Sequence, residues 1–169
     1  MSTLAVALPG IDSVVEAVIA WLTGVQFRTA LDDITKARGD GMALPSPALV
    51  IGGEVDPMTL NDWPAVMVLG GDAPTSSADQ QTQSDFDVSV LLLTVLQADD
   101  PIVLARQMQR YLLAQRVMMQ RTRSFYPLLP FAPSALGTMS PEPTRRLTDA
   151  NRYLKIGTFD FVVPISCDV

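Results

Sequence analysis

The chain has 169 residues, of which 48% are hydrophobic and 18% charged, and its formal net charge is −6. A chain of this length corresponds to one domain and can bury a substantial core. It contains no histidine, which excludes Ser-His-Asp and Cys-His catalytic arrangements and a zinc site built on imidazole. The single cysteine, Cys167, cannot form a disulfide within the chain. The excess of acidic residues disfavours tight binding to nucleic acid.

The first clear pattern in the chain is helical. Hydrophobic residues recur at helical spacing from Ile11 to Val25, which predicts an amphipathic helix. Ser13 and Glu16 have the spacing of a capping box, so we expect them to mark the start of this helix. After Gly24 the apolar residues move to a different face, which predicts a kink or break near this glycine.

Residues 39–62 are predicted to form an irregular, extended arm. They contain several prolines and glycines, which interrupt regular structure. Within the arm, residues 48–51 are predicted to form a short edge strand.

The middle of the chain predicts a hairpin with a long loop. Residues 65–69 form the first strand, which we expect the pair Gly70-Gly71 to end. Residues 72–85 are small and polar, so we expect a mobile loop. Residues 86–96 then alternate between apolar and polar at first and become apolar on both faces from Leu91. This pattern predicts a strand that runs from the margin of a sheet into its centre.

A second long helix is predicted to begin at Asp100-Pro101, with the aspartate as N-cap and the proline at the first helical position. Its apolar face, interrupted by Gln115, is formed by Leu104, Met108, Tyr111, Leu112, Met118 and Met119. Prolines after Arg123 exclude a further long helix. Short extended pieces are expected around 136–139, and a closing strand at 153–163. This order predicts a single α+β domain over residues 1–169. We expect its sheet to be antiparallel or mixed, with two main helices packed on one face.

The predicted second helix and the residues just after it carry a cluster of five of the twelve basic residues: Arg106, Arg110, Arg116, Arg121 and Arg123. Ten of the twelve basic residues are arginines, because Lys36 and Lys155 are the only lysines. Arginines surround two apolar residues on one side of this helix, which is the arrangement of a protein interface. We therefore predict a subunit contact formed by Arg106, Arg110, Leu113, Arg116 and Val117. The acidic partner surface on a neighbouring copy is expected around Asp72, Asp79 and Asp85.

Other interpretations of these residues remain open. The arginines can form a solvated face, or contact DNA phosphates, although the net charge of −6 disfavours the second. Asp85 and Asp87 share one face of a predicted strand and can bind a divalent cation, or simply be solvated. Neither Gly52-Gly53 nor Gly70-Gly71 belongs to a phosphate-binding loop, and we predict no cofactor or metal site. The longest apolar run, Val90 to Leu96, is too short to span a bilayer, so we expect no membrane partner.

The order of the predicted elements resembles that of a known family over most of the chain. The segments that carry it are the helix Ile11–Val25, the run Trp63-Pro64-Ala65-Val66-Met67-Val68, the strand Phe86–Leu96, the helix opened by Asp100-Pro101, and the closing strand Tyr153–Phe161. In this order they resemble the tail terminator and tail-completion proteins of tailed bacteriophages.

This resemblance implies an α+β virion protein, assembled in the host cytoplasm, that forms a homo-oligomeric ring, expected to be a hexamer. Such a ring sits on top of the tail tube, stops its growth, and joins the tail to the head through neck proteins. The implied partners are other copies of the chain, the tail tube protein and the neck proteins. DNA would pass through the lumen without specific binding, and no enzymatic active site is implied.

Two alternative functions remain. The same outline fits a neck, or head-completion, protein nearer the portal. A small α+β domain that binds an anionic ligand through Asp85, Asp87 and the arginine face is a rival from a different class.

Overall fold

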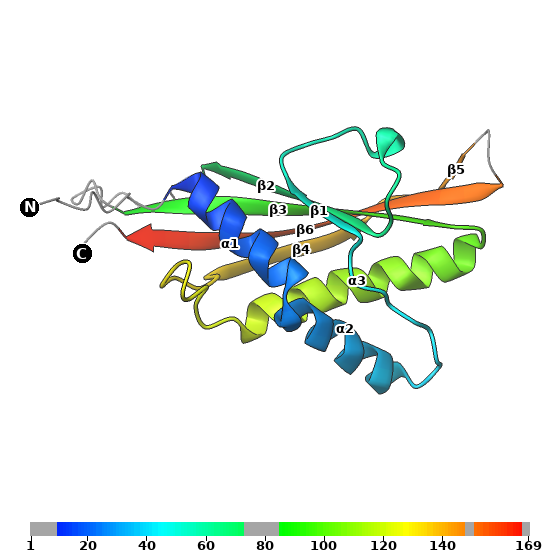
Figure 1. Ribbon diagram of the computed structural model, residues 1–169, viewed down its shortest axis with the longest axis horizontal. Coiled ribbons are helices and arrows are strands. Elements are labelled where there is room, and N and C mark those ends of the chain that lie inside the picture. Colours follow the sequence, from blue (N-terminus) through cyan, green and yellow to red (C-terminus); the bar gives the residue numbers. More distant parts are fainter. Residues whose placement is uncertain (1–9, 73–84, 148–150, 167–169) are drawn as a thin grey trace, which may run out of the picture.

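The structure is a computed structural model that describes residues 10–72, 85–147 and 151–166 (Figure 1). Its helices are α1 (Ile11–Thr23), α2 (Val25–Arg38), the short 3₁₀ helix η1 (Pro57–Thr59) and α3 (Pro101–Arg121). Its strands are β1 (Leu49–Gly52), β2 (Ala65–Asp72), β3 (Asp85–Ala98), β4 (Ala135–Pro141), β5 (Arg145–Leu147) and β6 (Arg152–Ser166).

The strands form one mixed sheet in the order β1-β2-β3-β6-β4, with β5 also paired to β6. β1 is parallel to β2, and the other neighbouring strands are antiparallel. In the described part of the chain, α1, α2 and α3 lie on one face of this sheet (Figure 1). The α+β prediction is therefore confirmed. The helix layer holds α1, α2 and α3, because the predicted break near Gly24 divides the N-terminal helical region into α1 and α2.

The main core lies between the helices and the sheet. On β3, the alternate residues Val88, Val90 and Leu92 are fully buried, as the apolar alternation predicted. In the strand register, Val90 lies opposite Phe161 and Leu92 opposite Phe159, so β3 and β6 present a continuous apolar face to the helices.

A smaller hydrophobic cluster covers part of the opposite face of the sheet. It is built on Met67 and Val95, whose neighbours in sequence point to the main core. Leu60 and Trp63, from the segment between η1 and β2, pack against it. The predicted arm is therefore extended and partly anchored, and it contains β1 and η1.

The N-terminal helix differs from its prediction at the start and agrees at the break. Gly10 is the N-cap of α1, and its N–H donates to Ser13 Oγ at 3.4 Å. Ser13 therefore lies inside the first turn, and the predicted Ser13–Glu16 capping box is wrong. The predicted break is confirmed, because α1 and α2 meet at Gly24 with a bend of 47°.

No single helix among the described residues has the length and hydropathy to cross a bilayer. α1 and α2 reach those values only when they are counted together across their bend.

The predicted hairpin is confirmed, but its first strand is longer than expected. β2 continues through Gly70 and Gly71 to Asp72, so the glycine pair does not end the strand. Gly70 lies beneath α1, and a Cβ atom there would stand 2.6 Å from Ile11 Cγ2. The glycine is therefore explained by the close approach of helix and strand. Most of the predicted mobile loop, residues 73–84, lies outside the described residues.

The second half of the fold agrees with the prediction. α3 begins after Asp100, whose Oδ1 accepts hydrogen bonds from the backbone N–H groups of Ile102 at 2.7 Å and Val103 at 3.3 Å. β4 contains the short strand expected near residues 136–139, with a bulge between Leu136 and Met139. The closing strand, β6, is longer than predicted at both ends.

Candidate interaction site on the arginine-bearing helix

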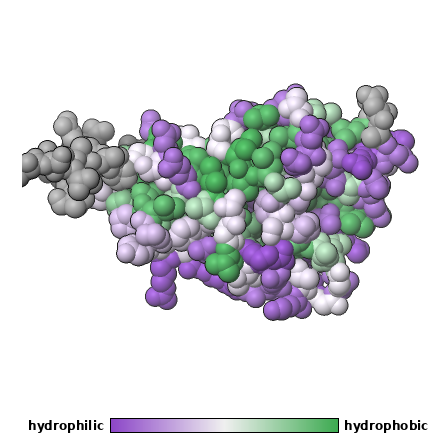
Figure 2. All heavy atoms as spheres, in the orientation of Figure 1, coloured by the Kyte–Doolittle hydropathy of each residue, from purple (hydrophilic) through white to green (hydrophobic). Residues whose placement is uncertain are grey.

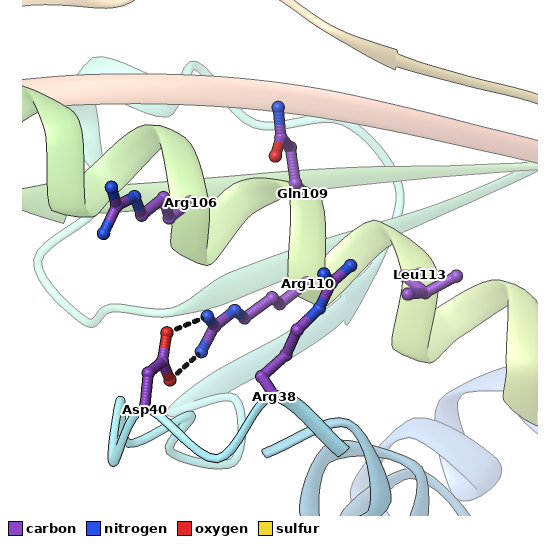
Figure 3. Close-up of a pocket in the computed structure, with 6 residues that line it drawn as sticks. All are labelled: Arg38, Asp40, Arg106, Gln109, Arg110 and Leu113. Atoms are coloured by element: carbon purple, nitrogen blue, oxygen red, sulfur yellow. Dashed lines mark hydrogen bonds and ion pairs between the residues drawn. The ribbon is translucent and has the colours of Figure 1, made fainter. Parts of the chain in front are cut away.

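A hollow of about 400 Å³ lies between the N-terminal half of α3, the end of α2 and the turn after α2 (Figure 3). The described residues that line it are Arg38, Asp40, Arg106, Gln109, Arg110 and Leu113. Three guanidinium groups and one carboxylate give this lining a formal charge of 3 − 1 = +2, on a chain whose net charge is −6. The hollow is therefore a local positive site on an acidic protein.

Arg110 and Asp40 form one wall of the hollow and are joined by a double hydrogen bond. Arg110 Nη1 donates to Asp40 Oδ1 at 2.8 Å, and Nη2 donates to Oδ2 (Figure 3). The Arg110 side chain is only 9% exposed, whereas that of Asp40 is 41% exposed. The hydrogen bond from Arg110, supported by the backbone N–H of Met42, holds the pKa of the Asp40 carboxyl well below its usual value. Both groups therefore stay ionised at neutral pH, and Arg110 is fixed in one orientation.

The sequence after α2 brings Asp40 to this position. Gly39 adopts a left-handed conformation, with φ of 64°, which reverses the chain at the end of the helix. The backbone N–H of Met42 then donates to Asp40 Oδ1 at 3.2 Å and orients the carboxylate. Further along, the Tyr111 hydroxyl donates to the Pro45 carbonyl oxygen and ties this segment to α3.

Arg38 and Arg106 are the groups that can bind a partner. Both are exposed, and within residues 10–72, 85–147 and 151–166 neither has a hydrogen-bond or ion-pair partner. Figure 3 shows the Arg38 side chain reaching toward α3, with its guanidinium group on the Leu113 side of Arg110, and Arg106 one turn earlier on α3. A guanidinium group donates hydrogen bonds in a plane and stays protonated, so it binds carboxylates or phosphates but does not take up a proton. This arrangement can bind an oxyanion and offers no acid–base chemistry of its own.

The structure brings together part of the predicted interface. Arg106, Arg110 and Leu113 line the hollow, whereas Arg116 and Val117 do not. Leu113 and Val117 are half-buried and pack partly against the main core. Arg110 is already paired within the chain, so it shapes the hollow and is not free to bind a neighbouring copy.

The predicted acidic partners lie elsewhere. Asp72 is exposed at the end of β2, far from the end of α2 in Figure 1. Asp85 is the first residue of β3, but its side chain lies outside the described part of the structure, as does the whole of Asp79. Any contact between Asp72 and the hollow would therefore have to come from another copy.

Three residues that line the hollow were not among the predicted site residues: Arg38, Asp40 and Gln109. Arg38 and Asp40 flank Gly39, and a glycine beside basic residues at the end of a helical pattern is a signal of a helix terminus that the sequence does contain. Nothing in that local pattern indicates that Asp40 reaches Arg110, which is 70 residues away.

The rival cation site receives no support from the described residues. Asp87 is half-buried on the face of β3 that points away from the helices. Among the residues described, no group of three or more potential metal-binding Cys, Asp or Glu side chains comes together.

A second hollow, of about 500 Å³, lies between α1 and the ends of β1 and β2. Its apolar lining includes Ile11, Val15, Ile19 and Leu69. Figure 2 shows hydrophobic surface in this upper part of the molecule, and hydrophilic residues along the lower edge, where α2 lies in Figure 1. The apolar hollow and the arginine-lined hollow are therefore separate surfaces.

No protein-family model matches the chain, and no curated protein is significantly similar to it in sequence.

Proposed function

We propose that this chain is a structural virion protein that forms a ring at the top of a phage tail tube. The ring ends tube growth and joins the tail to the head through neck proteins. The proposal is supported by the order of elements that resembles tail terminator and tail-completion proteins, and by an α+β fold of the kind this resemblance implies.

The observation that carries the proposal is the surface around the arginine-lined hollow. Half-buried Leu113 lies beside two guanidinium groups, of Arg38 and Arg106, that have no partner among the described residues. An apolar centre with a charged margin is the anatomy of a protein–protein contact. A ring needs such a contact to be heterologous, with two different surfaces of the same chain meeting around a closed circle.

Sedimentation velocity of the purified chain, with and without tail tube protein, tests this proposal. We expect a ring-sized oligomer, either alone or after tube protein is added. Leu113→Asp places a charge in the apolar centre and should weaken assembly while the far-ultraviolet circular dichroism stays unchanged. Ile102→Asp is a matched control, because Ile102 lies on the same helix, is 65% exposed and lies outside the hollow. A chain that stays monomeric in the presence of tube protein would count against the proposal.

Tail morphology separates the tail terminator from a neck protein nearer the portal. A phage that carries a stop codon in this gene should produce tubes of uncontrolled length if the ring ends tube growth. Tubes of normal length beside heads that fail to retain DNA would favour the neck protein. Electron micrographs of the two products distinguish these outcomes.

The positive hollow also favours one second candidate, a domain that binds a small anion. Calorimetry with inorganic phosphate and nucleotides tests it directly. Saturable heat that is lost in Arg106→Ala, in a chain that forms no ring, would favour this candidate.

A further inference from the structure

We propose that the arginine-lined hollow binds the acidic segment 54–62 of a second copy of this chain, in a head-to-tail contact. This inference rests on the proposed ring and names the two surfaces that meet in it. The segment connects β1 to β2 and includes η1.

The segment supplies carboxylates that match the hollow in charge. It contains Glu54, Asp56 and Asp62 and no basic residue, so its formal charge is −3. Glu54 and Asp62 are exposed, and neither has a hydrogen-bond or ion-pair partner in the described part of the chain. Two unpartnered carboxylates therefore correspond to the two unpartnered guanidinium groups of Arg38 and Arg106.

The segment also carries apolar residues that a contact would cover. Met58 is 59% exposed and Val55 is 39% exposed. Leu113 offers apolar surface in the lining of the hollow. Carboxylates beside exposed apolar side chains are complementary to guanidinium groups beside a leucine.

Both surfaces are held in place before they meet. Asp56 accepts a hydrogen bond from the N–H of Met58 at 2.9 Å, and Leu60 and Trp63 anchor the end of the segment on the smaller hydrophobic cluster. In the hollow, the Arg110–Asp40 pair fixes the wall. Binding therefore costs less conformational entropy than the docking of an unstructured tail.

The placement of the two surfaces suits a ring. Figure 1 shows η1 at the top of the molecule and the end of α2 at the bottom, so a chain cannot fold the segment into its own hollow. Two different surfaces on opposite sides of one subunit give a heterologous contact, which closes into a ring when the rotation between subunits allows it. A protein occupant is favoured over DNA, because the chain as a whole is acidic and would repel a phosphate backbone.

A charge-reversal series, followed by sedimentation velocity, tests the contact. Arg38→Glu with Arg106→Glu reverses the hollow, and Glu54→Arg with Asp62→Arg reverses the segment. Each double variant should weaken self-association roughly tenfold or more. An equimolar mixture of the two should assemble again, because in an alternating ring every reversed hollow meets a reversed segment and every original hollow meets an original one. The quadruple variant should also assemble alone.

The control for the hollow reversal is Lys36→Glu with Arg123→Glu, which lowers the net charge by the same amount as that reversal, at exposed sites outside the hollow. It should assemble like the original chain. Circular dichroism and thermal unfolding verify that every variant is folded.

The outcomes separate this inference from the proposed function. If the hollow-reversed variant forms rings normally, the inference is overturned and the ring proposal stands. If the reversed variants are folded but neither their mixture nor the quadruple variant assembles, the segment is not the partner. Retention of duplex DNA by the original chain, lost on reversal of the hollow, would assign the arginines to phosphates and overturn the inference. A chain that never assembles overturns both proposals.

A zero-length cross-link provides an independent readout. Arg106→Lys keeps the positive charge and adds an amine that a carbodiimide can couple to a carboxylate. We expect a covalent dimer whose linked peptides contain position 106 and either Glu54 or Asp62. Cross-links from position 106 to other acidic residues alone would contradict the contact.

Discussion

Arg110 and Asp40, which lie 70 residues apart in the chain, form a double hydrogen bond that joins the middle of α3 to the turn after α2. This pair does two things at once. It neutralises a nearly buried guanidinium group, and it leaves Arg38 and Arg106 on either side without partners among the described residues.

Asp40→Asn should lower the melting temperature of the protein, because it leaves the nearly buried Arg110 without a compensating charge. Asp33→Asn is the matched control. Its partner, Arg121, is 57% exposed, so water replaces the lost interaction and the melting temperature should hardly change. Thermal unfolding by circular dichroism measures both. Equal decreases in melting temperature for the two variants would contradict the expectation that the burial of Arg110 makes its pair with Asp40 more important for stability.

The same pair predicts a pH dependence with a definite sign. The pKa of Asp40 is lowered from about 3.8, so the folded state favours the ionised carboxylate. The ionised Asp40 carboxylate therefore stabilises the folded protein fully at pH values above its usual pKa. This stabilisation is lost as the pH falls through the lower pKa that the carboxyl has in the folded state. The difference in stability between the original chain and Asp40→Asn should therefore be constant from pH 5 to 8 and shrink below about pH 4. A difference that persists at lower pH would contradict this account.

Tyr111→Phe should reduce the free energy of unfolding by about 1 kcal/mol, because it removes the hydrogen bond to the Pro45 carbonyl. Tyr126→Phe, at a side chain that is 75% exposed, is the control and should have no effect. Burial raises the pKa of the Tyr111 hydroxyl above its usual value of 10.0. The folded state therefore keeps this proton longer, and stability should fall as the pH rises above about 10. Absorbance titration should show one late-ionising tyrosine, which Tyr111→Phe removes.

A buried polar pair under α3 should respond differently to single and double substitution. Gln115 Nε2 donates to Thr94 Oγ1 at 2.6 Å, and Gln115 Oε1 has no partner among the described residues. Thr94→Val leaves the Gln115 amide unsatisfied and should cost about 1–3 kcal/mol. Adding Gln115→Leu removes the stranded polar group and should recover most of that loss. Urea unfolding of the original chain, of each single variant and of the double variant measures these changes in the free energy of unfolding. Single-variant losses that simply add in the double variant would contradict the prediction.

Adjacent glycines in β2 should tolerate alanine unequally. At Gly70 a Cβ atom would stand 2.6 Å from Ile11 Cγ2 and 2.8 Å from Val15 Cγ2, so Gly70→Ala should cost about 1–3 kcal/mol through overpacking. At Gly71 nothing described lies within 4 Å of a Cβ atom, so Gly71→Ala should be neutral or slightly stabilising. Chemical unfolding of the two variants measures the difference. Similar costs at both positions would mean that α1 does not press on β2 as described.

The elements predicted best are those with strong local signals. α3 begins where Asp100 and Pro101 place it, and β3 and β6 follow their apolar alternation. The break at Gly24 was predicted because the apolar stripe changes face there. The errors came where a contact overrides a local signal. Gly70 indicated a strand end, yet β2 continues through it, and the glycine is explained by α1, which packs too closely there for a side chain.

The site was predicted only in part, for the same reason. The arginines of α3 and Leu113 were visible as a group at helical spacing on one element. Their division into the paired Arg110 and the unpaired Arg106 depends on Asp40, which belongs to another element. The acidic segment 54–62 was identified only as part of an irregular arm.

By itself, the sequence determined the α+β class, the long helix and the two central strands, because these follow from periodicity and caps within a few consecutive residues. Tertiary structure alone decided that α2 and its following turn meet α3, and so made a positive hollow on an acidic chain. The physical reason is that charge pairing and close packing depend on distance in space, and residues 70 positions apart carry no local sign of their contact.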